Sequence, residues 1–202
     1  APSTIDGVDA VIEQAIMRYA AGAFPMDDAD ADDLPWYTAP ERAIFEIDDA
    51  GRDTLRRKVR RDANRLADHE LAVDRDYEQV LKLCATPPPG EGVWITPRLA
   101  ALYRRLHAAG YSHSFELWTP DGDLAAGILG VVLGRAALLE SMRKRRPSAG
   151  NALLIRTLDH LAAHGITLCD IQLPTDHTLR LGCVLIPQHD YEQRLRLALG
   201  RP

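Results

Sequence analysis

Residues 165–174, GITLCDIQLP, are an apolar run bounded by Gly165 and Pro174. Alternating isoleucine and leucine in such a run predict a mostly buried strand. Asp170 and Gln172 lie two positions apart, and residues i and i+2 of a strand point to the same face. A carboxylate and a carboxamide would therefore project side by side from an apolar surface, where burial is costly without partners. The segment predicts either a satisfied polar pair at the end of a strand or part of a functional site.

Other strand-like runs on both sides of this segment predict a sheet. Ser112–Trp118 and Leu124–Leu133 are separated by TPDGD, whose Asp-Gly dipeptide is a hairpin signal. Residues 135–142 continue the meander, and 71–73 and Val184–Pro187 are shorter candidate strands. Together these runs provide enough strands for one sheet.

Apolar residues at helical spacing predict helices between and around the strands. The predicted helices cover residues 4–21, 77–84, 97–109 and 150–164 and a C-terminal segment that begins at Asp190. A strand meander followed by helix, strand and helix predicts an α/β or α+β architecture, with a mixed sheet flanked by helices.

An irregular stretch interrupts the chain before residue 40. It contains five aspartates within 27–33, followed by LPWYTAP, and we interpret the acidic run as a solvated loop. We therefore place a domain boundary near Pro40. Residues 1–40 are predicted to be a small N-terminal domain, and residues 41–202 the main domain.

The composition is that of a soluble globular protein. The 202 residues are 46% hydrophobic and 26% charged, and the net charge of −5 gives no global basic field for nucleic acid. The longest apolar stretch, 124–134, is too short to span a bilayer, and charges interrupt the first twenty residues where a signal peptide would be apolar. Three widely spaced cysteines predict buried thiols in a reducing compartment. We expect a cytoplasmic monomer with no membrane partner.

Polar side chains in the apolar strands are the first candidates for chemistry. Glu116, Glu140, Asp170 and Gln172 fall on strands that we predict to be neighbours. A carboxylate in such a place forms an ion pair, has a shifted pKa, or acts as a base, and none of these residues is diagnostic alone. The seven histidines show no metal-binding spacing, so no metal site is predicted.

Two basic segments contrast with the acidic balance of the whole chain. Residues 51–65 contain seven basic residues and two aspartates. The second segment, MRKRRPSAGNALL, places four basic residues before a predicted helix N-terminus, which favours anions. Two separate patches suit an extended polyanion better than one small ligand, although the second could be only a solvated loop. The candidate polyanion contacts are Arg56, Arg57, Arg60, Arg61, Arg143, Lys144, Arg145 and Arg146.

Seven short segments together carry a family resemblance. They are AFPM (23–26), WYTAPERA (36–43), Cys84-Ala85 with the WIT box (94–96), YRRLHAAGYSHSFELW (103–118), LAAGILGVVLG (124–134), ESM (140–142) and CDIQLPTDHTLRLG (169–182). Their types and order resemble the leucyl/phenylalanyl-tRNA–protein transferase family over nearly the whole chain.

The resemblance implies an N-terminal domain followed by a GNAT-like acyltransferase domain. It also implies transfer of Leu, Phe or Met from charged tRNA to the α-amino group of proteins that begin with Arg or Lys. This activity marks proteins for degradation by the N-end rule, and it uses no metal and no cofactor. The basic residues named above would then bind tRNA.

The resemblance also implies site residues. Asp170 and Gln172 would act in the transfer step, with Asp170 orienting Gln172 and helping to accept the amine proton, and Glu140 would hold the terminal adenosine or the acceptor amine. The implied substrate-binding residues are Trp94, Tyr103, Ser114, Glu116, Trp118, Ile128, Ala137, Met142, Leu168, Thr175 and His177.

The sequence departs from the family pattern around the expected aminoacyl pocket. Arg143 replaces the usual phenylalanine after ESM, Thr175 replaces an asparagine, and Ala137 replaces an aromatic residue. These departures therefore concern the preference for the donor amino acid.

Two alternatives remain at this point. RPSAGNA resembles the pyrophosphate turn of acyl-CoA-dependent GNAT enzymes, but Arg146 and Gly150 are one residue too far apart for it. A non-catalytic tRNA-binding protein that kept the fold is the second alternative. The intact set of Asp170, Gln172 and Glu140 argues against it.

Overall fold

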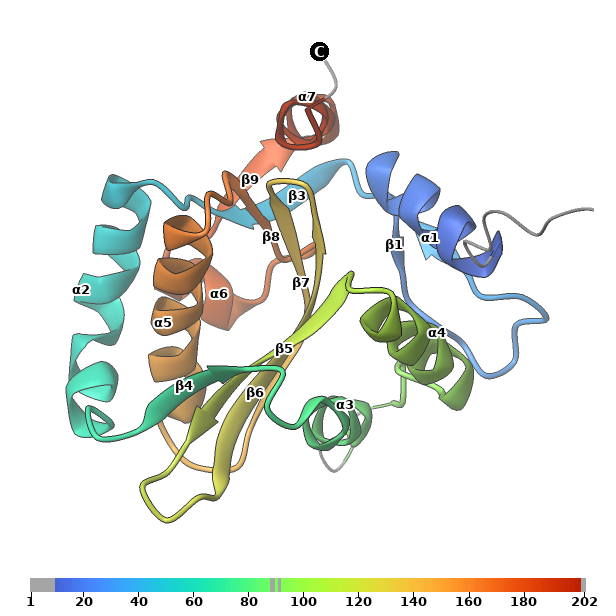
Figure 1. The fold of residues 1–202 in the computed structure, drawn as a ribbon. Coiled ribbons are helices and arrows are strands. Elements are labelled where there is room, and N and C mark those ends of the chain that lie inside the picture. The colour runs from blue at the N-terminus through green and yellow to red at the C-terminus, as the bar shows by residue number, and fades with distance from the viewer. Residues whose placement is uncertain (1–9, 88–89, 91, 201–202) are drawn as a thin grey trace, which may run out of the picture.

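The computed structural model describes residues 10–87, 90 and 92–200. Seven strands form one mixed sheet in the order β4-β5-β6-β7-β8-β3-β9 (Figure 1). Their bounds are β3 (Glu41–Phe45), β4 (Glu70–Val73), β5 (Ser112–Trp118), β6 (Leu124–Leu133), β7 (Ala136–Lys144), β8 (Leu168–Asp170) and β9 (Val184–Pro187). Within the described residues, only β7 and β8 pair in parallel, which requires a crossover connection. Two further short strands, β1 (Phe24–Pro25) and β2 (Trp36–Tyr37), form a separate antiparallel pair.

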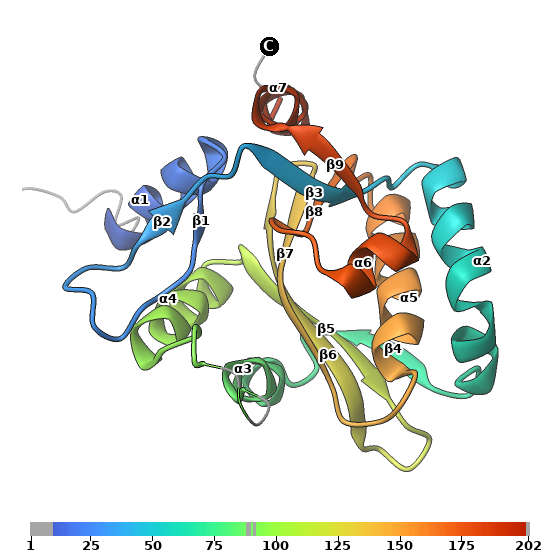
Figure 2. The ribbon, with the colours of Figure 1, turned by 180° about the vertical axis from the view of Figure 1, so that it is seen from behind.

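Helices cover both faces of the large sheet (Figures 1 and 2). They are α1 (Ala10–Ala20), α2 (Asp49–Arg65), α3 (Tyr77–Ala85), α4 (Pro97–Ala108), α5 (Ala149–Ala163), α6 (Asp176–Leu181) and α7 (Gln188–Ala198). On one face, α2 and α5 bury apolar residues such as Leu55 and Leu158 against the sheet. On the other face, α1, α3 and α4 form a second core with residues such as Tyr19 and Tyr103. Because α5 is the crossover between β7 and β8, it brings Glu140 of β7 close to Asp170 of β8.

Local signals explain where several of these elements begin. Asp48 caps α2 by accepting from the Gly51 amide, and Thr96 caps α4, which has Pro97 at its first position. Thr175 and Thr178 form a reciprocal capping box at the start of α6. This box fixes the chain where it enters α6, after the segment that follows β8.

The predicted mixed sheet flanked by helices is confirmed, and most predicted elements agree with the observed ones within a few residues. Of the helix predicted over 4–21, residues 4–9 lie outside the described residues. Helices α2 and α6 and strands β1, β2 and β3 were not predicted.

One prediction about residues 165–174 is wrong. Strand β8 ends at Asp170, and Gln172 lies beyond it with a left-handed φ of 59°. The two side chains are therefore not side by side on one strand face.

The acidic run is only partly a solvated loop. Four of its aspartates are exposed, but Asp27 is 5% exposed and pairs with Arg98 of α4 at 2.5 Å. Arg98 also donates to the backbone carbonyls of Ala31 and Asp32 at 3.1 and 2.9 Å. This pairing anchors the segment that follows Phe24–Pro25 against α4.

The division predicted at residue 40 falls between β2 of the small sheet and β3 of the large one. Helix α1 shares a core with α4, so the division stays a prediction about domains. The three cysteines are buried free thiols, as predicted. Of the helices within the described residues, none combines the length and apolar character needed to cross a lipid bilayer.

Candidate functional site

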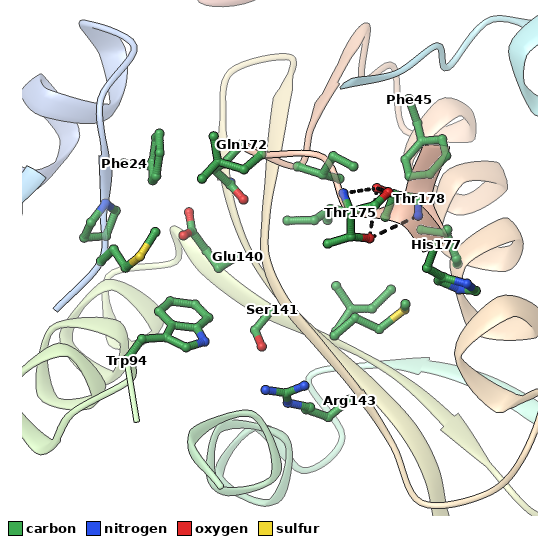
Figure 3. Close-up of a pocket in the computed structure, with 18 residues that line it drawn as sticks. Phe24, Phe45, Trp94, Glu140, Ser141, Arg143, Gln172, Thr175, His177 and Thr178 are labelled. Atoms are coloured by element: carbon green, nitrogen blue, oxygen red, sulfur yellow. Dashed lines mark hydrogen bonds between the residues drawn. The ribbon is translucent and has the colours of Figure 1, made fainter. Parts of the chain in front are cut away.

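A cavity of about 560 Å³ opens beside the end of β7 (Figure 3). Its walls come from seven parts of the chain: Phe24 to Met26, Phe45, Trp94, Ile128, the end of β7, Leu154, and the segment from Ile171 to the start of α6. Most of the lining is apolar, and Ile128, Leu139, Met142 and Leu154 form part of it. A cavity of this kind with a few polar groups is suited to an apolar ligand group held in a fixed orientation.

Glu140 and Gln172 lie on the same side of the cavity, beside Phe24 (Figure 3). Glu140 is 8% exposed, and its Oε2 accepts from the Tyr103 hydroxyl at 3.1 Å. Its other oxygen, Oε1, has no hydrogen-bond partner among the described residues. Burial first, and then the charge of Asp170, raise the pKa of Glu140 to about 8, although the hydrogen bond from Tyr103 opposes the rise. A carboxyl group with this pKa can exchange a proton near neutral pH.

Asp170 is fully buried and does not line the cavity. Its Oδ1 accepts from Arg42 Nε at 2.9 Å and from the Gln172 backbone amide at 2.8 Å. Its Oδ2 accepts from Arg42 Nη2 at 2.7 Å and from the Tyr191 hydroxyl at 2.9 Å. The bidentate ion pair is therefore completed by two further donors, which is the arrangement that a buried charge pair requires.

Arg42 connects Asp170 to the cavity wall. It is fully buried on β3, and its Nη1 donates to the Gly22 carbonyl at 2.7 Å. Its guanidinium carbon lies 4.7 Å from the ring centre of Phe24, which lines the cavity, and 4.3 Å from that of Tyr191. The motif WYTAPERA contains Arg42, but sequence reasoning assigned no role to Arg42 or to Tyr191. The available signal was an arginine inside the otherwise apolar run RAIF.

Gln172 reaches the cavity through a turn rather than through a strand. Its backbone amide donates to Asp170, and its backbone carbonyl accepts from the Ala43 amide at 3.0 Å. When the side-chain nitrogen faces the carbonyls of Ile171 and Leu139, it donates to both at 3.0 Å. The left-handed residue thus directs the amide into the cavity while Asp170 stays behind it.

The cavity includes five of the predicted substrate-binding residues and leaves out the other six. Trp94, Ile128, Met142, Thr175 and His177 line it, and so does Arg143, which we predicted as a tRNA contact. Tyr103, Ser114, Glu116, Trp118, Ala137 and Leu168 do not line it. Sequence reasoning assigned no role to Phe24, Leu154 or Leu173, which also line it.

Glu116 illustrates the structural alternative for a buried polar residue. Its carboxylate accepts from the Ser114 hydroxyl at 2.7 Å, from the Trp118 indole at 2.7 Å and from the Asp76 amide at 2.9 Å. These partners satisfy it away from the cavity. Ala137 and Leu168 are core residues with exposures of 0% and 2%. Because Glu116, Ala137 and Leu168 do not line the cavity, the cavity gives no support to the prediction that they bind substrate.

The two basic segments meet in space around Asp62. Its carboxylate accepts from Asn151 Nδ2 at 2.7 Å, and hydrogen bonds from Ser148 and Asn151 lower the pKa of Asp62, with smaller contributions from Arg65 and Lys144. We call the surface that surrounds this point the basic surface; it comprises Arg57, Lys58, Arg60, Arg61, Arg143 and Lys144. Arg143 belongs both to this surface and to the cavity, so the surface continues into the cavity mouth.

The other predicted basic contacts have acidic or amide partners. Arg56 pairs with Asp159 at 2.9 Å and also with Asp53. Arg146 pairs with Asp123 at 3.1 Å, and Arg145 donates to Gln79 at 2.7 Å. A polyanion that bound these three arginines would compete with those partners.

The start of α5 is not an open anion site. The Asp62 carboxylate lies there, bonded to Asn151 in the first turn and to Ser148 at the N-cap. Negative charge at a helix N-terminus satisfies the dipole that a bound phosphate would otherwise satisfy. This arrangement disfavours the pyrophosphate of an acyl-CoA at this position.

The fold of this chain, a mixed sheet flanked by helices, is shared with a solved structure. The crystal structure of FemX matches this chain with a TM-score of 0.56 at 12% identity, over 94% of this chain and 71% of that one. A family model described as leucyl/phenylalanyl-tRNA protein transferase matches residues 49–196.

Relatives in that family share much of the sequence. The leucyl/phenylalanyl-tRNA–protein transferase of Thermosynechococcus vestitus is 38% identical over 92% of this chain and 90% of its own length. The corresponding transferase of Deinococcus radiodurans is 36% identical over 95% of this chain and 90% of its own length. The chain belongs to the leucyl/phenylalanyl-tRNA–protein transferase family.

Proposed function

We propose that this protein transfers Leu, Phe or Met from aminoacyl-tRNA to the α-amino group of proteins that begin with Arg or Lys. The observation that carries the proposal is one cavity with an apolar wall, two polar side chains at one side and a basic surface at its mouth. An aminoacyl ester is already activated, so the enzyme mainly has to hold it against a neutral amine in attacking geometry.

Each part of the site fits one part of the substrates. The apolar wall accommodates the donor side chain, and Trp94 offers an aromatic face on which an unstacked terminal base can lie. The basic surface follows the tRNA backbone through phosphate contacts. Glu140 and Gln172 are the polar groups that the attacking amine and the ester carbonyl meet inside the cavity.

The acyl-CoA alternative has less support. Its cofactor would place a pyrophosphate at the start of α5, where Asp62 already lies.

We further propose that the protein acts as a cytoplasmic monomer and that residues 1–40 are its small N-terminal domain. Light scattering on the purified protein measures the monomer directly.

The deciding experiment is a transfer assay with radiolabelled Leu-, Phe-, Met-, Val- and Ile-tRNA and a peptide with N-terminal Arg. We expect transfer of the first three and much slower transfer of the β-branched pair, because an apolar pocket discriminates by shape at about 1–3 kcal/mol per methylene. The same peptide with an acetylated N-terminus is the control and should accept nothing. Transfer from acetyl-CoA, or preferred transfer of charged amino acids, would contradict the proposal.

Narrowing the cavity should change the donor preference. Leu154→Trp adds bulk to the apolar wall, so we expect the ratio of Phe to Leu transfer to fall by about tenfold, within the range for one mismatched group in such a pocket. Competition between the two charged tRNAs measures this ratio. Leu197→Trp is the matched control, because Leu197 is 64% exposed on α7 and should leave the ratio unchanged. An unchanged ratio in Leu154→Trp would remove this wall from the donor site.

A further inference from the structure

We infer that the two neighbouring carboxylates divide the work of the transfer step: Glu140 accepts the proton of the attacking amine, while Asp170, held by Arg42 and Tyr191, positions Gln172. This inference rests on the proposed function and names the residue that moves the proton. It differs from the expectation in which Asp170 shares in accepting the proton.

The hydrogen-bonding capacity of the Asp170 carboxylate is already taken up by protein donors. Both of its oxygens accept two hydrogen bonds each, and its side chain is 0% exposed. A proton on either oxygen would displace a donor and leave the Arg42 charge buried without its counter-ion. Because Asp170 lies behind the cavity lining, an amine in the cavity would also have to pass Gln172 to reach it.

Unlike Asp170, Glu140 has an oxygen that can accept a proton from an amine in the cavity. It lines the cavity, and its Oε1 is buried with no hydrogen-bond partner among the described residues. The titratable groups that act on it come from four elements: Tyr19 of α1, Tyr103 of α4, Asp170 of β8 and Arg42 of β3. Burial first and then the charge of Asp170 raise the pKa of Glu140 to about 8, while Tyr103, Tyr19 and Arg42 oppose the rise. Two adjacent carboxyl groups in such different surroundings are typical of a divided acid–base role.

The step balances without any further reactant. The neutral amine nitrogen forms a bond to the ester carbonyl carbon, and the bond from that carbon to the ribose oxygen breaks. The proton that leaves the nitrogen passes to the Glu140 carboxylate and then to the departing ribose oxygen. The products are the amide and the free tRNA hydroxyl, and Glu140 returns to its carboxylate form.

Arg42 and Tyr191 are positioning residues in this scheme. They hold the carboxylate whose Oδ1 accepts from the Gln172 amide, and this bond fixes the left-handed turn. Arg42 also holds the Gly22 carbonyl and stacks beside Phe24 in the cavity wall. Arg42 therefore fixes the position of the polar end of the cavity relative to the wall that contains Phe24.

The test compares pH profiles of single-turnover transfer between pH 6 and 9, with subsaturating peptide. In the wild type both the amine, whose pKa is about 7.7–8.0, and Glu140 must lose a proton, so the logarithm of the rate should rise with a limiting slope of two. Glu140→Gln should lower the rate at pH 8 by about 10²–10⁴ and reduce the slope to one. Tyr191→Phe removes one donor from Asp170 and keeps the ring, so it should be slower at every pH with the slope of two retained.

Two further readouts separate a proton-accepting role from a structural one. Tyr103→Phe removes the hydrogen bond that opposes the raised pKa of Glu140, so the lower limb of the profile should move to higher pH. The melting temperature of the wild type relative to Glu140→Gln should fall as the pH rises from about 5 through about 8. The sign follows because the folded state holds the Glu140 proton at a pH where the unfolded state, with a pKa near 4.5, has released it.

Three results would overturn the assignment while the wild type transfers normally. They are a Glu140→Gln rate within threefold of wild type, a slope of two that survives this substitution, and a slope that drops to one in Tyr191→Phe. A wild type that transfers no amino acid from any tRNA would instead reject the proposed function itself.

Discussion

Asp170→Asn is expected to lower the free energy of unfolding by about 3–5 kcal/mol, the usual cost of removing one partner from a buried ion pair. Arg42 would remain buried with its charge uncompensated, because Asp170 is its only acidic partner at ion-pair distance among the described residues. Urea denaturation at neutral pH measures the change. A loss below about 1 kcal/mol would mean that Arg42 finds water or another acceptor after the substitution.

A double variant of Arg42 and Asp170 distinguishes the cost of one unpaired buried charge from the cost of losing the ion pair as a whole. Arg42→Met alone should also be strongly destabilising, because it leaves the Asp170 carboxylate with only Tyr191 and Gln172 as donors. Arg42→Met combined with Asp170→Asn should cost less than the sum of the two single changes, since neither charge is then left unpaired. Any loss of transfer in Asp170→Asn must therefore be measured on protein shown to be folded.

The second large effect concerns tRNA. Replacing Arg60 and Arg61 of the basic surface by glutamate should lower the affinity for tRNA by about tenfold or more at low salt. It should also reduce the slope of log K against log salt by about two. The physical reason is that each neutralised phosphate releases counterions, and two such contacts are lost. Filter binding across a salt series gives both numbers.

A matched control tests whether position or net charge matters. Arg194 and Arg196 lie on α7, which Figure 1 shows apart from α2, and reversing both changes the net charge by the same amount. We expect this pair to leave the salt slope unchanged. Equal weakening by both pairs would show that tRNA responds to the overall charge rather than to a defined surface.

Sequence reasoning succeeded where the signals are local. The Asp-Gly hairpin between β5 and β6, the apolar face of α4 and the apolar β9 strand depend on residues close together in the chain. The family resemblance selected Glu140 and Gln172, and both line the cavity. It also selected Asp170, but the strand pattern placed Asp170 beside Gln172 on one face, which the structure does not show.

The failures have a common physical cause, which is contact between distant segments. The rule that residues i and i+2 share a face holds only while the strand continues, and β8 ends where Ala43 of β3 binds the backbone of Ile171 and Gln172. Arg42 was given no role because its partner Asp170 is 128 positions away. Leu154 faces the cavity because of how α5 packs, and no periodic pattern distinguishes that face from the core.

The contacts of Arg42 also determine the order in which the site can form during folding. Its guanidinium contacts Gly22, which precedes it by 20 residues, and Tyr191, which follows it by 149. Contacts of such separation carry a large loop-closure cost and are made after local helices and hairpins. During synthesis Arg42 leaves the ribosome long before α7 does, so its contact with Tyr191 can form only after nearly the whole chain has been made. The polar end of the cavity is therefore a late product of folding, and a nascent chain that lacks α7 cannot complete it.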